Sequence, residues 1–175
     1  MNIKYLIFKM SSTTIFIVAL LAGSTFGKEV IVQNKGKVGL TVSVSGLSGI
    51  QLPPKGKSIL DLPENWQGKI SGCSELCDGP KTVADLTLSP TLDQYDVSLS
   101  NGFNIPIKVI PVHGGKCKAA VCASRKINKI CPLESQVKNT LGEVVACKNN
   151  PLIEAICPKA RIMECKAESI RVILG

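Results

Sequence analysis

The chain has 175 residues, of which 45% are hydrophobic and 4% aromatic, and its 21 basic and 13 acidic residues give a net charge of +8. This length suits one domain rather than several. The excess positive charge lies in residues 116–175, which hold eleven basic and five acidic residues and no aromatic residue. Without an aromatic side chain to stack on bases, this basic segment argues against nucleic acid as a partner.

The first 27 residues have the pattern of a secretory signal peptide. Lys4 and Lys9 precede an apolar run at 15–22, and small residues follow it up to Gly27. The run is too short to span a membrane, and no later stretch approaches the roughly 20 apolar residues of a spanning helix. We therefore expect cleavage after Gly27, no membrane span, and a secreted domain over residues 28–175.

The rest of the chain consists of short segments with the alternation of β-strands. In chain order we expect strands at 28–33, 38–45, 50–52, 58–62, 82–88, 95–100, 103–112 and 170–174. Pro106 and Pro111 favour a sheet edge or a bulge for the strand over 103–112. Helix is limited to a turn or two, at 123–130 or 152–156. Many short strands with Pro and Gly turns predict an all-β fold, an antiparallel β-sandwich.

Residues 95–106, which read YDVSLSNGFNIP, are the most distinctive segment. Tyr95, Val97 and Leu99 alternate with polar residues, as in a strand with one buried face. Asn101 and Gly102 tolerate positive φ, so the segment predicts a β-hairpin that resumes at residue 103. Asp96, like Asp85 in the preceding strand, lies on the polar face. Taken alone, such aspartates and an Asn-Gly turn need no functional role.

All eight cysteines follow the predicted cleavage site. An even number of cysteines in an exported chain predicts disulfides, in this case four. No CxxC pair or histidine cluster indicates a metal site, and we expect neither a metal nor a cofactor. His113, the only histidine, is interpreted as a surface loop residue.

The segment at 95–106 closely resembles the YDxSLVDGFNIP segment of the plant thaumatin-like, or osmotin-like, pathogenesis-related proteins. Further segments agree in the same order along the chain: NWQGKISGC, TVADLTL, GGKCKAAVCA, CPLESQVKN, EVVACK and CPKA followed by ECKAESIRVIL. The resemblance covers nearly all of residues 28–175 and identifies the chain as a shortened, divergent member. It implies a thaumatin-like β-sandwich with a reduced disulfide-rich loop region.

The resemblance also implies how the cysteines pair, which their spacing alone does not decide. The implied pairs are Cys73–Cys77, Cys117–Cys165, Cys122–Cys157 and Cys131–Cys147. In family members two other cysteines pair with each other, at positions that correspond to Gly36 and to the residue just after the last strand, where the sequence has Gly175. Both halves of that disulfide are absent together, so no unpaired thiol is left over.

Family members carry an acidic cleft of one Arg, one Glu and three Asp, associated with β-1,3-glucan binding and, in some members, weak endoglucanase activity. By position, the Arg corresponds to Lys69, the Glu to Asp85, and the three Asp to Asp96, Asn101 and Lys159. Since Asn101 cannot ionise and Lys159 reverses a charge, the cleft would be close to neutral or positive. The carboxyl groups of Asp85 and Asp96 would then be less exposed to like charges, which are one cause of a raised pKa in a catalytic acid. Glycoside hydrolysis needs two carboxyls at a defined separation, so we expect hydrolysis to be lost.

The expected function is therefore a secreted defence protein that acts by binding. Candidate partners are the β-1,3-glucan of fungal walls, an anionic microbial surface or membrane in contact with the basic residues 116–175, and a protein. Two alternatives stay open: a weak endo-β-1,3-glucanase with Asp85 and Asp96 as catalytic residues, and an inhibitor of foreign hydrolases. We expect a monomer, located in the apoplast or the vacuole.

Overall fold

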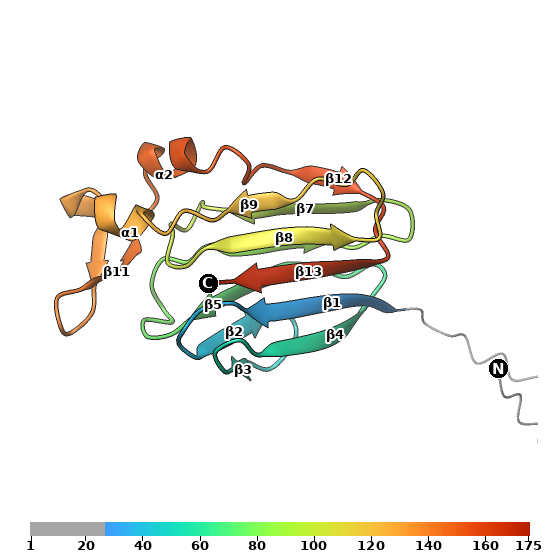
Figure 1. Cartoon of the computed structure of the whole chain (residues 1–175), viewed down its shortest axis with the longest axis horizontal. Coiled ribbons are helices and arrows are strands. Elements are labelled where there is room, and N and C mark those ends of the chain that lie inside the picture. Colours follow the sequence, from blue (N-terminus) through green and yellow to red (C-terminus); the bar gives the residue numbers. More distant parts are fainter. Residues whose placement is uncertain (1–26) are drawn as a thin grey trace, which may run out of the picture.

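The computed structural model describes residues 27–175, so the predicted signal peptide, apart from Gly27, lies outside the described residues. Figure 1 shows two β-sheets stacked on each other, with a lobe of short helices and strands at one end. No helix among the described residues is long and apolar enough to cross a membrane. The predicted all-β sandwich is confirmed.

The first sheet has five strands in the order β4-β1-β13-β8-β9. Their bounds are β4 (Lys57–Pro63), β1 (Gly27–Asn34), β13 (Ser169–Leu174), β8 (Ile107–Val112) and β9 (Ala120–Cys122). The first and last strands, β1 and β13, are neighbours and run parallel, while every other strand pair that the structure describes is antiparallel. The sequence did not predict this parallel pair.

The second sheet has six strands in the order β12-β7-β6-β5-β2-β3. Their bounds are β12 (Met163–Cys165), β7 (Asp93–Ser98), β6 (Val83–Thr87), β5 (Gln67–Cys73), β2 (Leu40–Val44) and β3 (Ile50–Leu52). Alternate residues of both sheets meet in one core, as the period of two requires. In β13, for example, Ile170, Val172 and Leu174 are fully buried.

The lobe lies between β9 and β12 in the sequence and contains little regular structure. It comprises α1 (Ile127–Ile130), the 3-10 helix η1 (Leu133–Ser135), the pair β10 (Gln136–Lys138) and β11 (Val144–Cys147), and α2 (Pro151–Ile156). Asn150 begins α2 because its side chain accepts hydrogen bonds from the N–H groups of Leu152 and Ile153. The four disulfides of the structure are the four pairs that the resemblance implies, and one of them, Cys122–Cys157, connects the end of α2 to β9.

The predicted β-hairpin at Asn101–Gly102 is wrong. Strand β7 ends at Ser98 in the second sheet, and the next strand, β8, begins at Ile107 in the first sheet. Gly102 does adopt a positive φ of 94°, but the chain then crosses between the sheets, and Phe103 pairs with Cys147 of the lobe. Because a crossing segment also buries alternate apolar residues, the sequence pattern could not separate it from a hairpin.

Pro111 lies in the part of β8 that forms an edge of the sheet, as the sequence predicts. Strand β8 lies between β13 and β9, yet β9 pairs only with residues 107–109. Pro111 therefore has a partner strand on one side alone, through Ile170 of β13. Its lack of an N–H group costs no hydrogen bond on the open side.

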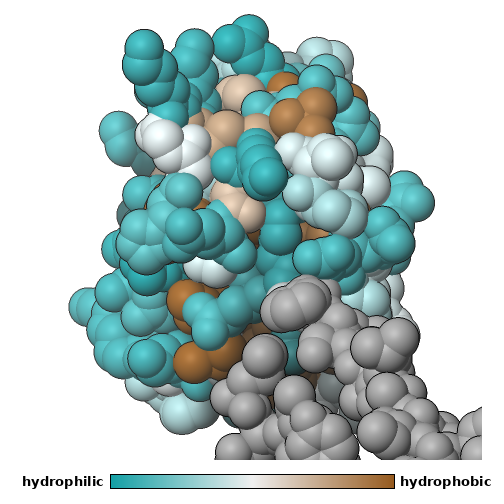
Figure 2. All heavy atoms as spheres, turned by 90° about the vertical axis from the view of Figure 1, so that its right-hand side faces the viewer, coloured by the Kyte–Doolittle hydropathy of each residue, from teal (hydrophilic) through white to brown (hydrophobic). Residues whose placement is uncertain are grey.

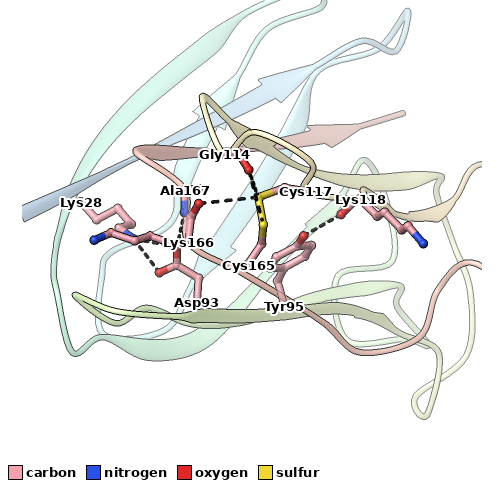
Figure 3. Close-up of a disulfide and its surroundings, with 9 residues drawn as sticks. All are labelled: Lys28, Asp93, Tyr95, Gly114, Cys117, Lys118, Cys165, Lys166 and Ala167. Atoms are coloured by element: carbon pink, nitrogen blue, oxygen red, sulfur yellow. Dashed lines mark hydrogen bonds and ion pairs between the residues drawn. A yellow bond between two sulfur atoms is a disulfide. The ribbon is translucent and has the colours of Figure 1, made fainter.

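A buried ion pair joins the two sheets at the end where β1 begins. The surface of this end is mostly hydrophilic, with small hydrophobic patches (Figure 2). Beneath it, Lys28 Nζ lies 2.6 and 2.7 Å from the two carboxylate oxygens of Asp93, with exposed fractions of 9% and 0% for the two side chains. Asp93 also accepts hydrogen bonds from the N–H groups of Ser89 and Ala167. Figure 3 shows this pair beside the Cys117–Cys165 disulfide.

Candidate functional site

Three of the five residues of the predicted cleft form one row across the second sheet. Lys69 of β5 pairs with Asp85 of β6, and Asp85 pairs with Asp96 of β7. Opposite residues on neighbouring strands have Cβ atoms about 4.5–5.5 Å apart, so the three side chains are neighbours on one face. Because the residues next to them in each strand are buried, the row lies on the outer face of the sheet.

Lys69 and Asp85 form an ion pair within this row. Lys69 Nζ lies 3.8 Å from Asp85 Oδ2, and the exposed fractions of the two side chains are 67% and 33%. A pair this exposed contributes little to stability. Its effect is on the charge of the row, because it places a cation beside one of the two carboxylates.

The environment of Asp96 raises the pKa of its carboxyl group. Burial, and after it the negative charge of Asp85, raises the pKa of Asp96 to about 6, although Lys69 acts in the opposite direction. The expectation that the substitutions at Asn101 and Lys159 remove one cause of a raised pKa stays a prediction, but the pKa of Asp96 is raised nonetheless. The sheet register supplies Asp85 as the like charge, and the substituted positions Asn101 and Lys159 are not among the causes of the shift.

This shift predicts how stability depends on pH. The folded pKa lies above the ordinary value of 3.8, so the folded state favours the protonated acid. The resulting stabilisation is complete below about pH 4 and is lost as the pH rises through about 6. Relative to Asp96→Asn, which stays neutral, the wild type should lose about 1–2 kcal/mol between pH 4 and 7, a value reduced for the partial exposure of the carboxyl. Urea unfolding of both proteins at pH 4 and at pH 7 measures this change. A difference in the free energy of unfolding that is the same at both pH values would contradict the prediction.

A groove of about 450 Å³ runs beside Asp96. One wall is the end of β7 and the residues after it, and the other is α2 with the segment that follows. The polar side chains that line it are Asp96, Ser98, Ser100, Asn149, Glu154 and Arg161. The N–H of Val97 donates to the carbonyl of Ala160 at 3.0 Å, which joins the two walls.

The other two residues of the predicted cleft do not line this groove. Asn101 is exposed at the turn after β7, where its carbonyl accepts a hydrogen bond from the N–H of Lys81. Lys159 is exposed and its carbonyl accepts from the N–H of Val121 in β9. The structure therefore unites Lys69, Asp85 and Asp96 in a row and leaves Asn101 and Lys159 outside the groove.

Sequence reasoning missed two charged residues of the groove, Glu154 and Arg161. Arg161 follows Lys159 by two residues, so a shift of two positions in the family match would exchange them. Glu154 lies in α2, and a helix of six residues gives the sequence no periodicity from which its orientation could be predicted.

Comparison with known proteins gives a consistent result. The family model that matches is that of the thaumatin family, over residues 70–165. A thaumatin-like protein of Arabidopsis thaliana is 37% identical over 128 residues, which cover 58% of this chain and 52% of that protein. Thaumatin-like protein 1 of Prunus persica is 36% identical over 132 residues, covering 59% of this chain and 53% of the relative.

Two further comparisons concern activity and fold. A protein of Prunus avium named glucan endo-1,3-beta-glucosidase is 34% identical over 129 residues, covering 57% of this chain and 52% of that protein. The chain thus spans about half the length of the curated relatives it matches. Among solved structures, the protein elicitor MoHrip2 from Magnaporthe oryzae has a TM-score of 0.54 at 12% identity, covering 84% of this chain and 98% of that one. This likeness concerns the fold alone.

Proposed function

This chain belongs to the thaumatin family, and from that premise we propose that it is a secreted defence protein that binds β-1,3-glucan in the groove beside Asp96 without cleaving it. Four disulfides suit an oxidising compartment outside the cytosol. They agree with secretion, which is part of the proposal.

The observation that carries the proposal is the polar lining of the groove. Asp96 and Glu154 accept hydrogen bonds, Arg161 donates them, and Ser98 and Ser100 do both. The hydroxyl groups of a glucan chain also donate and accept, so they match this set of groups. No aromatic residue lines the groove in the described structure, so we expect modest affinity.

The same geometry argues against hydrolysis by Asp85 and Asp96. The two residues lie side by side on one face of the sheet, and Asp85 does not line the groove. Hydrolysis needs an acid and a second carboxyl that flank the glycosidic bond. Asp85 lies instead beside Lys69, whose Nζ is 3.8 Å from Asp85 Oδ2.

A second candidate function, a weak endo-β-1,3-glucanase, is favoured by one observation. The pKa of Asp96 is raised to about 6, and a carboxyl with a raised pKa is what a general acid requires. In this case Glu154, which lines the groove together with Asp96, would be a better placed second carboxyl than Asp85.

The proposal predicts retention on insoluble β-1,3-glucan. Arg161→Gln removes an exposed donor from the groove, and we expect the retained fraction to fall about three- to tenfold. Lys108→Gln makes the same charge change on an exposed position of β8 and should have no effect. Because the glucan is neutral, salt should not weaken retention. Equal retention of the two variants would contradict the groove as the binding site.

A reducing-sugar assay on laminarin separates the two candidate functions. If the protein only binds, neither the wild type nor Asp96→Asn releases sugar. Release by the wild type together with loss of release in Asp96→Asn would reject the binding-only proposal and establish the glucanase.

A further inference from the structure

A second pocket, which we name the basic pocket, lies where five segments of the chain meet. The segments are the loop after β1, the turn before β4, residues 103–106, the residues at the start of α1 and Gly175 after β13. The pocket has a volume of about 280 Å³ and is lined by Lys35, Lys37, Lys55 and Arg125, while no acidic residue of the described structure lines it. Three of these cations come from residues 28–115, whose eight basic and eight acidic residues balance, so the charge pattern of the sequence does not indicate a basic site there.

The charges of the basic pocket lack counter-charges. Within the described part of the chain, none of its four cations has a carboxylate within the 4.0 Å of an ion pair, and Lys55 instead donates to the carbonyl of Lys35 at 2.6 Å. Even with a carboxylate at Gly175, the last residue of the sequence, the lining keeps a surplus of three positive charges. Like charges gathered in a concave site repel each other and attract an anion.

Two glycines of the basic pocket lie at the positions where the resemblance implies the absent disulfide. Gly36 and Gly175, the two positions at which the resemblance implies cysteines, both line the pocket. They face each other, because a Cβ atom added to Gly175 would lie 2.8 Å from the nitrogen of Gly36. The two backbones therefore approach each other more closely than a side chain at Gly175 would allow.

The remaining lining residues indicate the chemistry of the occupant. Asn128 lines the pocket and its Oδ1 is buried without a hydrogen-bond partner in the described structure, so a hydroxyl donor that reaches it would satisfy it. The one aromatic residue, Phe103, is 1% exposed and cannot stack on a base. No exposed leucine, isoleucine or valine lines the pocket to hold an acyl chain. An anion with hydroxyl groups fits this set, and a nucleic acid or a lipid does not.

We propose that the basic pocket binds a carboxylate-bearing oligosaccharide, at a site separate from the groove beside Asp96. The carboxylates would contact Lys35, Lys37, Lys55 and Arg125 around the pocket, and a sugar hydroxyl would donate to Asn128. Binding of this kind weakens as salt increases, in contrast to binding of a neutral glucan in the groove.

Isothermal titration calorimetry with the trimer of galacturonic acid tests the proposal. We expect binding at low salt, and affinity about tenfold weaker in the double variant Lys37→Gln/Arg125→Gln. The matched control, Lys108→Gln/Lys116→Gln, removes the same charge from exposed positions outside the pocket and should change affinity less than about twofold. All four side chains are exposed, so the thermal unfolding midpoints should stay close to that of the wild type.

Two further ligands complete the test. The methyl-esterified trimer keeps the hydroxyl groups but has no charge, and we expect it not to bind. Inorganic phosphate should bind at least tenfold more weakly than the acidic trimer, because it lacks the sugar hydroxyls. Equal weakening in the two double variants would overturn the proposal in favour of diffuse charge attraction. Phosphate binding as tight as that of the trimer would overturn it in favour of a general anion site.

Discussion

Replacing Asp93 with Asn is expected to destabilise the protein by about 3–5 kcal/mol at pH 7. Asp93 is fully buried and both its oxygens contact Lys28 Nζ, while backbone N–H groups on two other segments also donate to it. The substitution leaves the buried ammonium of Lys28 without a counter-charge, and this unpaired charge is the main cause of the loss. Urea unfolding monitored by circular dichroism measures the free energy of unfolding.

Two variants control this prediction. Asp78→Asn makes the same chemical change at an exposed position and should alter stability by less than about 0.5 kcal/mol. The double variant Lys28→Met/Asp93→Leu removes both charges and should recover much of the lost stability, because the penalty comes from leaving one charge unpaired. A double variant as unstable as Asp93→Asn would show that the unpaired charge is not the cause.

Replacing Cys122 and Cys157 with Ala together is expected to cost about 3–4 kcal/mol, the value for a disulfide that closes a loop of this length. The two cysteines are 35 residues apart and are buried, with exposed fractions of 0% and 6%. Their bond fixes the end of α2 against β9, and Cys157 itself lines the groove. The variant should therefore lose retention on β-1,3-glucan as well as stability.

The disulfide between Cys73 and Cys77 provides the matched control. It closes a separation of only four residues and does not line the groove, so its removal should cost about 2 kcal/mol or less and leave glucan retention unchanged. The same urea unfolding and pull-down measurements apply to both. Equal losses of stability and of retention in the two variants would mean that the Cys122–Cys157 bond has no special role in the groove wall.

The sequence predicted strands best where one apolar face alternates with polar residues, as in β13. It missed β5, whose sequence QGKISGC contains two glycines that weaken the alternation. The structure explains one of them, because a Cβ atom at Gly68 would lie 2.5 Å from Cζ2 of Trp66. Such a close approach depends on the tertiary fold and leaves no trace in a local pattern.

The candidate site could be predicted only in part, for a similar reason. Asp85 and Asp96 were found through the resemblance, and the sheet register then made them neighbours. The buried partner of Asp93 was missed because Lys28, 65 residues away, appeared in the sequence only as the residue after a cleavage site. The cations of the basic pocket come from segments separated by up to 90 residues, from Lys35 to Arg125, so only folding gathers them.

The parallel pairing of β1 with β13 has a consequence for how the first sheet assembles. Strand β13, at residues 169–174, lies between β1 and β8 and separates them. Until β13 pairs, β1 and β8 have no strand to join them, so the earlier strands cannot complete this sheet by themselves. Because most of the domain separates β1 from β13 in the sequence, we expect this pairing to be slow and to form late in folding.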